Sequence, residues 1–585
     1  MRFIKIKKIL STSLALGMLF NYSLPTFAST LSDDTRYETF EGSNITINDI
    51  LEPDEVDVEI EGNTLVNVLN YDSPKIGEYW TYTNNCGYMS LADKTDSYKG
   101  IVYNFNKDIE LNKEYTMFIN VTKNTMKLYG NEGNGIAKIS FLDDSLEGHI
   151  MYIQPSQTGV IKYVFRPTKI QNYNTYISIL PRAYDGEFEY KDFMIIEGNH
   201  IDKDISFFEG IKSVGELEKN KIEVKLKNKN LFNINNVHPE DSIGINDDVS
   251  INIADNSLLI SKMDSHSNFV GLRIKCENNK EYTIGFKGGI NKAGKSHEIY
   301  VYKDKPWGEV IAILENSSST ETKYKSFTTT SDEIFIGCYL SKNTEVDEVL
   351  EYKDIFVYEG DGSEYIQYQE NLLQYTLSEP LRGLPDGVKD RIVKINNQWY
   401  IERNTGYKIL DGSENWYYPN EFVDATLEYT QYYTDYFNNK NINVHKRVYS
   451  DKLITDVSGY NKNNEAIMSG WASKNIHIRI SKNRLKNDNA EEFKEWLSKN
   501  SITMIYQLSE PIYEPINIYS SINLFEDTTY ILTNSTIPAN LRVTVDRVVN
   551  RAKEYSELSK ENPTIENISL ARMWVNRMRE SILTN

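Results

Sequence analysis

The side chains best suited to binding chemistry are aromatic residues grouped in two polar stretches of the sequence. Sugars have apolar C–H faces that stack on Trp or Tyr rings, while neighbouring polar side chains hold their hydroxyl groups. The candidate ligand-binding residues are Tyr79, Trp80, Tyr82 and Tyr88 in the first stretch and Tyr300, Tyr302 and Trp307 in the second. The alternative is that these rings close the ends of a β-sandwich and contact no ligand.

Two common catalytic motifs are missing from the sequence. It contains neither a Gly-x-Ser-x-Gly elbow nor a His-Glu-x-x-His zinc motif. Its acidic residues include adjacent pairs such as Asp143 with Asp144. Glycoside hydrolysis, however, needs two carboxylates that flank a cleft at a defined separation. We therefore predict a protein that is not an enzyme and uses no cofactor, and we keep a secreted polysaccharide- or peptidoglycan-degrading hydrolase as an alternative.

The N-terminus predicts export. Four basic residues precede the apolar run 9–20, and Pro25 then leads to the small residue Ala28. This order is typical of a secretory signal peptide, here residues 1–28. The apolar run is shorter than the roughly 20 residues that cross a bilayer. We expect a secreted or cell-surface protein without an integral membrane span.

Charge and cysteine content narrow the remaining classes. The formal net charge of −20 argues against nucleic acid, because binding a phosphate backbone requires clustered Lys and Arg. The cysteines Cys86, Cys276 and Cys338 are too few for a disulfide framework, which leaves a Cys276–Cys338 disulfide and three free buried thiols as alternatives. The sequence has no Cys-x-x-Cys motif and no His-rich cluster that would indicate a zinc site. Its acidic loops could hold a structural Ca²⁺, so the metal content stays unknown.

An internal repeat organises the first two thirds of the chain. Three pairs of segments match in the same order at nearly constant offset: 56–67 with 222–233, 113–116 (Lys-Glu-Tyr-Thr) with 280–283, and 189–192 (Glu-Tyr-Lys-Asp) with 351–354. Within each unit, short segments of period two alternate with clusters of Asn, Asp, Gly and Ser, which is typical of an antiparallel sandwich. A unit of about 140 residues with eight or so strands fits a jelly roll.

The order of these features resembles a CenC-type carbohydrate-binding module. The shared features are an Asn-rich opening strand, an exposed aromatic residue, a Lys-Glu-Tyr-Thr strand and a closing Tyr-Lys-Asp strand. The resemblance covers both units and implies binding of a glycan or a cell-wall polysaccharide.

The segment 364–515 carries a different set of motifs. They are Leu-Ser-Glu-Pro-Leu at 377–381, Gly-Leu-Pro-Asp-Gly-Val-Lys-Asp at 383–390, Leu-Asp-Gly-Ser-Glu-Asn-Trp at 410–416 and Gln-Leu-Ser-Glu-Pro at 507–511. In this order they resemble a segment of tail and baseplate proteins of phages of Gram-positive bacteria. The resemblance implies a receptor-binding part of a tail tip, or a part next to it, and identifies no ligand residues. The signal peptide departs from that family, because phage tail proteins are released by lysis.

The apolar period changes near the C-terminus. Spacings of four, three, four and three predict a two-heptad helical seam over Leu541, Val545, Val548, Ala552 and Tyr555. A second helix follows Pro563. The hairpin either packs on the preceding domain or mediates homo-oligomerisation.

Together these features predict a mainly β protein of tandem antiparallel β-sandwich (jelly-roll) modules with a short C-terminal α-helical hairpin. The expected segments are a signal peptide (1–28), a linker or strand segment (29–55), two jelly-roll modules (56–200 and 222–362), a phage-tail-like β-sandwich module (364–515), linker strands (516–540) and the hairpin (541–585). The expected function is non-catalytic recognition of cell-surface or cell-wall glycans, and a structural tail or fibre component that assembles through its C-terminal region is the second alternative.

Overall fold

The computed structural model describes most of the chain beyond residue 36. It covers 37–584 except 51–54, 92–99, 106–108, 128–136, 143–149, 168–175, 182–184, 204, 241–248, 264–266, 304, 397, 419–427, 439, 444–447, 456–464, 470–474, 518–521 and 547. The predicted signal peptide lies outside the described residues. Among the helices that are described, none combines the length and the apolar character needed to cross a membrane.

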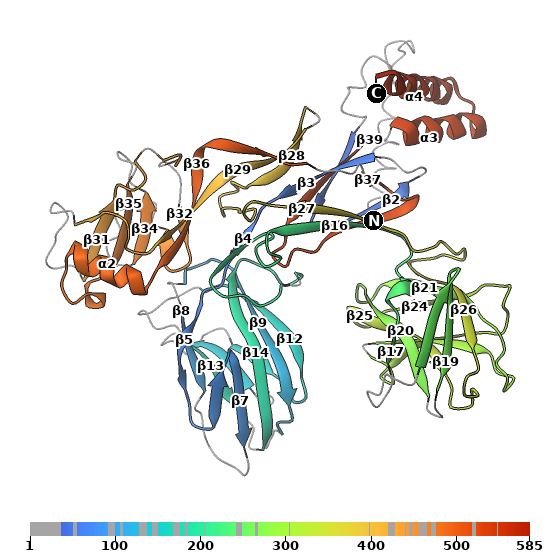
Figure 1. Ribbon diagram of the computed structural model, residues 1–585, viewed down its shortest axis with the longest axis horizontal. Coiled ribbons are helices and arrows are strands. Elements are labelled where there is room, and N and C mark those ends of the chain that lie inside the picture. The colour runs from blue at the N-terminus through green and yellow to red at the C-terminus, as the bar shows by residue number, and fades with distance from the viewer. Residues whose placement is uncertain are drawn as a thin grey trace, which may run out of the picture.

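The protein is mainly β, as predicted, and is organised around a central sandwich of two sheets (Figure 1). The first sheet has the order β1 (Tyr37–Gly42), β39 (Asn540–Asp546), β3 (Glu55–Glu61), β28 (Arg391–Ile395), β29 (Gln398–Leu410), β36 (Ile502–Pro515) and β32 (Val448–Ser450), and β37 (Ile522–Asn523) pairs with β3. The second sheet has the order β2 (Asn44–Ile50), β38 (Asp527–Thr533), β16 (Lys221–Asn228) and β27 (Glu370–Thr376). Both sheets therefore combine strands from the two ends of the described chain with strands from its middle.

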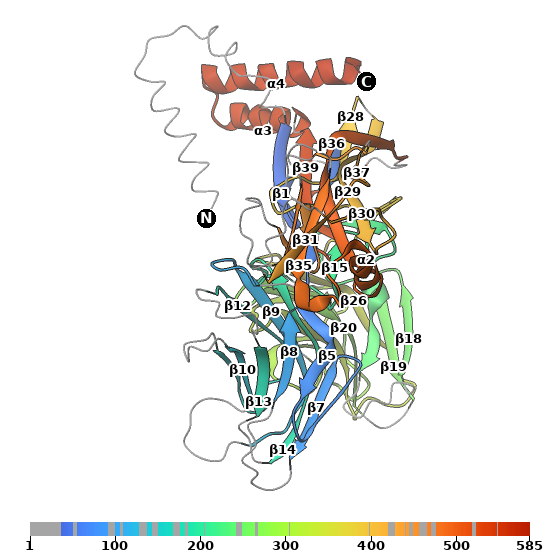
Figure 2. The same cartoon turned by 90° about the vertical axis from the view of Figure 1, so that its left-hand side faces the viewer.

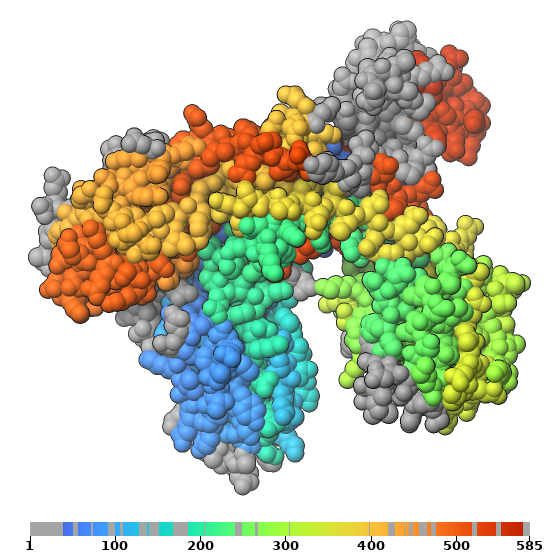
Figure 3. Space-filling view, viewed as in Figure 1, coloured from blue at the N-terminus to red at the C-terminus, as the bar shows by residue number. Residues whose placement is uncertain are grey.

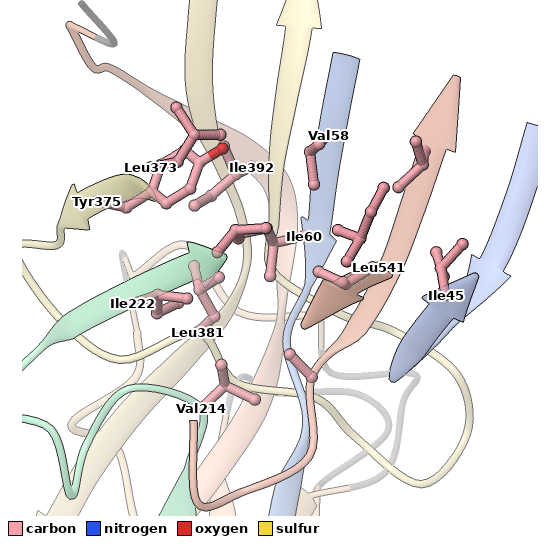
Figure 4. Close-up of a cluster of buried hydrophobic side chains, with 14 of the residues drawn as sticks. Ile45, Val58, Ile60, Val214, Ile222, Leu373, Tyr375, Leu381, Ile392 and Leu541 are labelled. Atoms are coloured by element: carbon pink, nitrogen blue, oxygen red, sulfur yellow. The ribbon is translucent and has the colours of Figure 1, made fainter. Parts of the chain in front are cut away.

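One hydrophobic core lies between these sheets (Figure 4). In β3, Val56, Val58 and Ile60 are buried and alternate with acidic residues, as expected when successive side chains point to opposite faces. The apolar residues of β16 from Ile222 to Leu226 follow the same pattern and enter the same core. These two strands are the first matching pair of the internal repeat. The sequence placed them at the start of the modules, but strands from the chain ends complete their pairing in the central sandwich.

Each repeat unit continues into a sandwich of two five-stranded sheets. In the first module, one sheet has the order β11 (Ile150–Ile153), β10 (Ala137–Leu142), β13 (Tyr176–Pro181), β8 (Ile101–Phe105) and β5 (Leu69–Ile76). It packs on a second sheet of the order β12 (Gly159–Phe165), β9 (Tyr115–Asn124), β14 (Gly186–Glu197), β7 (Cys86–Leu91) and β6 (Trp80–Thr83). A separate pair is formed by β4 (Thr64–Val66) and β15 (Ile211–Ser213).

The second module repeats this arrangement. Its first sheet has the order β17 (His238–Glu240), β20 (Asn268–Lys275), β25 (Glu333–Leu340), β22 (His297–Tyr302) and β23 (Val310–Asn316). This sheet packs on a second one of the order β18 (Val249–Ala254), β19 (Ser257–Lys262), β26 (Leu350–Glu359), β21 (Glu281–Lys287) and β24 (Lys323–Thr328). The strand orders correspond, so that β8 matches β20, β14 matches β26, and the hairpin β6–β7 matches β18–β19. Figure 3 shows the two modules as separate lobes below the central sandwich.

The long strands β29 and β36 lead from the central sandwich into a smaller lobe. Its sheet has the order β30 (Trp416–Tyr417), β31 (Tyr429–Thr434), β35 (Ile476–Ser481), β34 (Ala466–Ser469) and β33 (Ile454–Thr455). Helix α2 (Ala490–Lys499) covers this sheet: Phe493 stacks on Tyr432 with ring centroids 4.2 Å apart, and Leu497 is buried. Asn489 caps the helix by accepting a hydrogen bond from the backbone of Glu492.

The C-terminal hairpin begins later than predicted. Leu541 and Val545 lie in β39, where they and Val543 alternate into the central core, so the first two positions of the predicted helical seam are wrong. A spacing of four residues fits a strand as well as a helix, and burial between two sheets decides in favour of the strand. Helix α3 (Val548–Glu561) and helix α4 (Ile565–Thr584) follow and bury Ala552 and Trp574 against each other. Figure 2 shows both helices at the end of the molecule far from the modules.

Neighbouring leucines of β27 test the central core. Leu373 is 5% exposed and lies in the core, whereas Leu372 is 51% exposed on the same strand. We expect Leu373→Ala to lower the free energy of unfolding by about 2–5 kcal/mol, because it removes buried methyl groups and leaves a cavity. The matched variant Leu372→Ala is expected to change it by about 0.5 kcal/mol or less. Equal effects in denaturant unfolding would contradict this assignment of the core.

Two truncations test where the sandwich ends. Removing residues 548–585 deletes only the helical hairpin, so we expect the remaining chain to unfold cooperatively at nearly the same denaturant concentration. Removing residues 540–585 also deletes β39, which pairs with both β1 and β3. We expect that chain to lose the central sandwich and to become sensitive to limited proteolysis in β1–β3. Equal protease resistance of the two truncated chains would be incompatible with this pairing.

Candidate functional site

The repeated sequence motifs hold the modules together. Lys113 pairs with Glu197 at 2.7 Å, and its counterpart Lys280 pairs with Glu359 at 2.5 Å. The threonine of each Lys-Glu-Tyr-Thr motif donates to a glycine carbonyl at 2.7 Å: Thr116 to Gly198 and Thr283 to Gly360. The tyrosine of each motif accepts a backbone hydrogen bond at 3.0 Å: Tyr115 from Glu110 and Tyr282 from Glu277. The repeated residues therefore maintain a framework that the two modules share. The residues that differ between the modules are the candidates for contact with a ligand.

The first aromatic group does not form an exposed stacking surface. Trp80 is 6% exposed and contacts the rings of Phe188 and Tyr190 edge-on, at 6.3 and 6.0 Å. This burial agrees with the alternative that the ring packs within the sandwich and contacts no ligand: β6 is a strand, and alternation turns Trp80 into the core of the first module.

The other members of the first group are spread over this end of the module. Tyr79 is 44% exposed, Tyr82 packs on the core and donates to Asn85 at 2.9 Å, and Tyr88 donates to Glu187 at 2.8 Å. Two of the three hydroxyls are thus bound within the protein, and only Tyr79 presents an exposed ring.

The second aromatic group does come together in the structure. Tyr300 and Tyr302 lie on β22 with their rings stacked at 5.8 Å and 12°. Trp307, in the turn after β22, contacts Phe269 of β20 at 5.0 Å and Tyr339 of β25 at 6.1 Å. With Phe335, these residues form a cluster separate from the module core, which we call the aromatic face.

The aromatic face has a buried layer and an exposed layer. Phe269, Tyr302 and Phe335 are at most 3% exposed and form its base. Trp307 is 44% exposed, while Tyr300 and Tyr339 are partly exposed. The exposed rings therefore rest on other rings, which fix their orientation.

Backbone geometry makes room for this face. Gly337 lies opposite Tyr300, and a Cβ atom there would come within 2.6 Å of Phe335 and 3.0 Å of Phe269. Trp307, in the turn after β22, has φ of +63°, an uncommon conformation for a bulky residue.

Polar groups border the aromatic face. The hydroxyl of Tyr300 donates to the Glu298 carboxylate at 3.1 Å, and Tyr339 donates to Ser267 at 3.3 Å. Burial and the adjacent Glu298 carboxylate raise the pKa of Tyr300, so its hydroxyl stays protonated and able to donate. Flat rings edged by hydroxyls and one carboxylate can stack on a sugar and hydrogen-bond its hydroxyl groups.

The strand that carries Phe269 differs between the two modules. In the first module, the counterpart of β20 is β8, which turns Tyr103 and Ile101 into the core and exposes Asn104. The framework is therefore repeated, but this strand of the aromatic face is not. Sequence analysis missed Phe269, Phe335 and Tyr339 because they lie in strands that are apolar on both faces, where alternation gives no signal of which side is the core.

The segment that resembles phage tail proteins contains a buried ion pair. Asp390 is fully buried; it accepts from the backbone of Asn404 and of Thr405, each at 2.9 Å, and lies 3.3 Å from the Arg403 guanidinium. Arg403 also donates to the carbonyls of Pro380 at 2.7 Å and Glu379 at 2.8 Å. Burial raises the pKa of the Asp390 carboxyl, while Arg403 and the backbone donors oppose that rise. The motif residues at 377–390 thus fix how β27, β28 and β29 join.

The structure contradicts the Cys276–Cys338 disulfide. All three cysteines are free. Cys338 lies opposite Val270 in the sheet, whereas the backbone of Cys276 bonds to Asp332, which precedes Cys338 by six residues. Six strand residues span about 20 Å, far more than the ~6 Å between Cα atoms of a disulfide.

Residues 289–296 match the spacing Gly-x-x-x-x-Gly-Lys-Ser of a phosphate-binding loop, a match that the sequence analysis overlooked. Such a loop binds phosphate where a strand leads into a helix. Here the segment joins β21 to β22 as a tight turn, closed by a 2.9 Å bond from the backbone of Asn291 to Lys295. The Glu348 carboxylate, which repels anions, accepts from the backbone of Lys292. The match therefore carries no phosphate site.

No group of three or more His, Cys, Asp or Glu side chains is placed to hold a metal ion in the part of the chain that the structure describes. The structural Ca²⁺ considered above remains a prediction, because backbone carbonyls also serve as its ligands.

No family model and no curated protein matches the chain. Among solved structures, a tandem of CBM22 domains of Xyn10C from Paenibacillus barcinonensis covers 54% of this chain and 98% of its own, at 8% identity and a TM-score of 0.17. Tandem CBM51 modules of a Streptococcus pneumoniae family 98 glycoside hydrolase cover 54% and 100%, at 11% identity and a TM-score of 0.14. Allantoicase from Saccharomyces cerevisiae covers 58% and 99%, at 9% identity and a TM-score of 0.16. These scores are too low to support an argument about function.

We expect the second module, which carries the aromatic face, to be less stable to unfolding at acidic pH. His297 lies in β22; burial lowers its pKa, and its Nδ1 is 2.6 Å from the Gly289 carbonyl. In the unfolded chain a histidine has a pKa of about 6.5, so the unfolded chain binds a proton more readily than the folded one. The free energy of unfolding is therefore highest above pH ~6.5 and falls as the pH drops below that value, by at most about 1.4 kcal/mol per pH unit.

Hydrogen exchange of β22 at about pH 7.5 and pH 5.5 measures this effect. We expect faster exchange at the lower pH, corrected for intrinsic rates, and a smaller increase in His297→Gln. An equal increase in both proteins would show that His297 is not responsible.

Proposed function

We propose that this protein is exported and recognises glycans of a cell surface or cell wall through the aromatic face of its second module, without catalysis. The observation that carries the proposal is the exposed Trp307, flanked by Tyr300 and Tyr339 and supported from below by buried rings. Exposed apolar groups that lie next to one another often mark a site of contact with a ligand or partner. The fixed rings also lose little conformational entropy on binding.

The polar border favours a carbohydrate over a purely apolar ligand. The Glu298 carboxylate and the hydroxyls of Tyr300 and Tyr339 lie at the edge of the rings, where sugar hydroxyls would be. This chemistry needs neither a metal nor a cofactor.

Within this proposal, the segment 364–515 serves as scaffold. Its tail-like motifs bind the backbone of the central sandwich through Asp390 and Arg403, which supports a role in holding the two modules. We infer that a tail-derived architecture has been combined with an export signal.

Trp307→Ala tests the proposal directly. We expect the variant to bind purified cell-wall polysaccharide or a glycan array about tenfold or more weakly, because central aromatic anchors commonly contribute 2 kcal/mol or more. The matched control is Tyr324→Ala, which removes a 56% exposed ring from β24 on the opposite sheet of the same module. This control should bind like the natural protein.

Thermal unfolding of the Trp307→Ala variant distinguishes a role of Trp307 in ligand binding from a role in packing. If Trp307 only closes the turn after β22, its removal lowers the melting temperature and leaves the affinity of the folded protein unchanged. That result, or a lack of glycan binding by the natural protein, would refute the proposal.

A further inference from the structure

Two glutamates face each other at one border of the aromatic face. Glu298 of β22 and Glu315 of β23 are directly opposite in the antiparallel register. Both side chains project from the same face of the sheet as Tyr300, which follows Glu298 by two residues on the same strand. Opposite residues of an antiparallel pair have Cβ atoms about 4.5–5.5 Å apart. The two carboxylates therefore border one small area of the surface, next to a partly exposed ring.

No basic side chain among the described residues neutralises this pair. Neither Glu298 nor Glu315 takes part in an ion pair within that part of the chain. The Glu298 carboxylate accepts from the Tyr300 hydroxyl at 3.1 Å, and Lys325 of the neighbouring β24 donates to the Ile313 carbonyl at 3.1 Å instead of to a carboxylate. Like charges directly opposite each other destabilise a sheet, so a bound cation would relieve this repulsion.

The rings beside the glutamates suit a cation as well as a sugar. The Tyr352 hydroxyl lies 3.1 Å from the Glu298 carbonyl oxygen and 3.0 Å from that of Tyr339, so Tyr339 is next to Glu298 across the strands. Trp307 in turn contacts Tyr339 with ring centroids 6.1 Å apart. A protonated amine within about 6 Å of such a ring is attracted to its face. A single amine at this border can therefore meet both carboxylates and a ring.

The first module has no such pair of glutamates. By strand order, its hairpin β10–β11 corresponds to β22–β23. Neither β10 nor β11 contains an acidic residue, and their register places Lys138 opposite Tyr152. The framework that the two modules share therefore does not require two carboxylates at this border, which leaves a role in ligand contact for the pair in the second module.

The other end of the aromatic face is basic. Arg273 of β20 lies opposite Phe335, with its guanidinium carbon 6.0 Å from the centroid of that ring. Lys275 follows on the same strand, opposite Glu333. The charges along the face are therefore unequal: a cationic group of a ligand is attracted to the end that carries the two glutamates and is repelled from the end that carries Arg273.

We propose that the aromatic face selects a glycan unit that carries a free, protonated amine, and that Glu298 and Glu315 determine this specificity. The inference rests on the proposed function, because the same rings, Trp307, Tyr300 and Tyr339, hold the sugar. Its ammonium group lies between the two carboxylates, where charge-assisted hydrogen bonds are stronger than those between neutral groups. An N-acetylated unit places a neutral amide there and leaves both carboxylates without a cation.

Two sugars that differ only in the amine test this inference. The probes are the β-1,4-linked tetramers of glucosamine and of N-acetylglucosamine, titrated calorimetrically into the full chain at about pH 6, where an aliphatic amine is protonated. We expect the glucosamine tetramer to bind about tenfold more tightly, and this preference to fall about fivefold in Glu315→Gln. The matched control Glu281→Gln removes an exposed carboxylate from β21 on the opposite sheet and should keep the full preference.

The outcomes separate this inference from the proposed function. Equal affinity for the two tetramers, no binding of either, or a preference that Glu315→Gln leaves unchanged or reduces no more than Glu281→Gln does overturns the inference. In each of these cases the proposed function still stands if the natural chain binds another glycan and Trp307→Ala weakens that binding. If the natural chain binds no glycan at all, both fail.

Discussion

The central sandwich, to which the modules and the smaller lobe are attached, depends on pairing between the two ends of the described chain. β1 and β3 flank β39, and β2 pairs with β38, so the central core is complete only when the first and last strands are both in place. The contact between Glu61 and Asn540 joins residues 479 positions apart. Both modules and the smaller lobe are insertions into this closed sandwich. The second module and the lobe each leave and return through neighbouring strands, β16 with β27 and β29 with β36, whereas the first module leaves from β3 in one sheet and returns to β16 in the other.

The two modules show how one framework can carry different surfaces. Asn67 and Asn230 make corresponding hydrogen bonds where each module meets the sandwich, and Lys113 and Lys280 make corresponding ion pairs. Differences lie elsewhere, in the aromatic face. The residues that preserve the fold are thus separated in space from the rings that we propose to bind a ligand.

Much of this architecture was predictable from the sequence. Period-two segments and the repeated Lys-Glu-Tyr-Thr gave two sandwiches with matching strands, and Trp307 in a polar stretch marked part of the aromatic face. Trp80 was misplaced because polar neighbours say nothing about the direction of an alternating strand. The central sandwich was not predicted, since pairing between strands hundreds of residues apart leaves no local pattern. Leu541 and Val545 were assigned to a helix because spacing alone does not reveal a second sheet packed against them.

Closure of the sandwich by its last strands also imposes an order of folding. A chain that emerges with its N-terminus first presents β1, β2 and β3 long before β38 and β39 exist, and unpaired strand edges of this kind are prone to aggregation. The modules, whose contacts are more local, can fold in the meantime. A chain with this topology therefore spends its synthesis as folded modules on an unfinished centre. Any factor that protects those early strands would act on the centre and not on the modules.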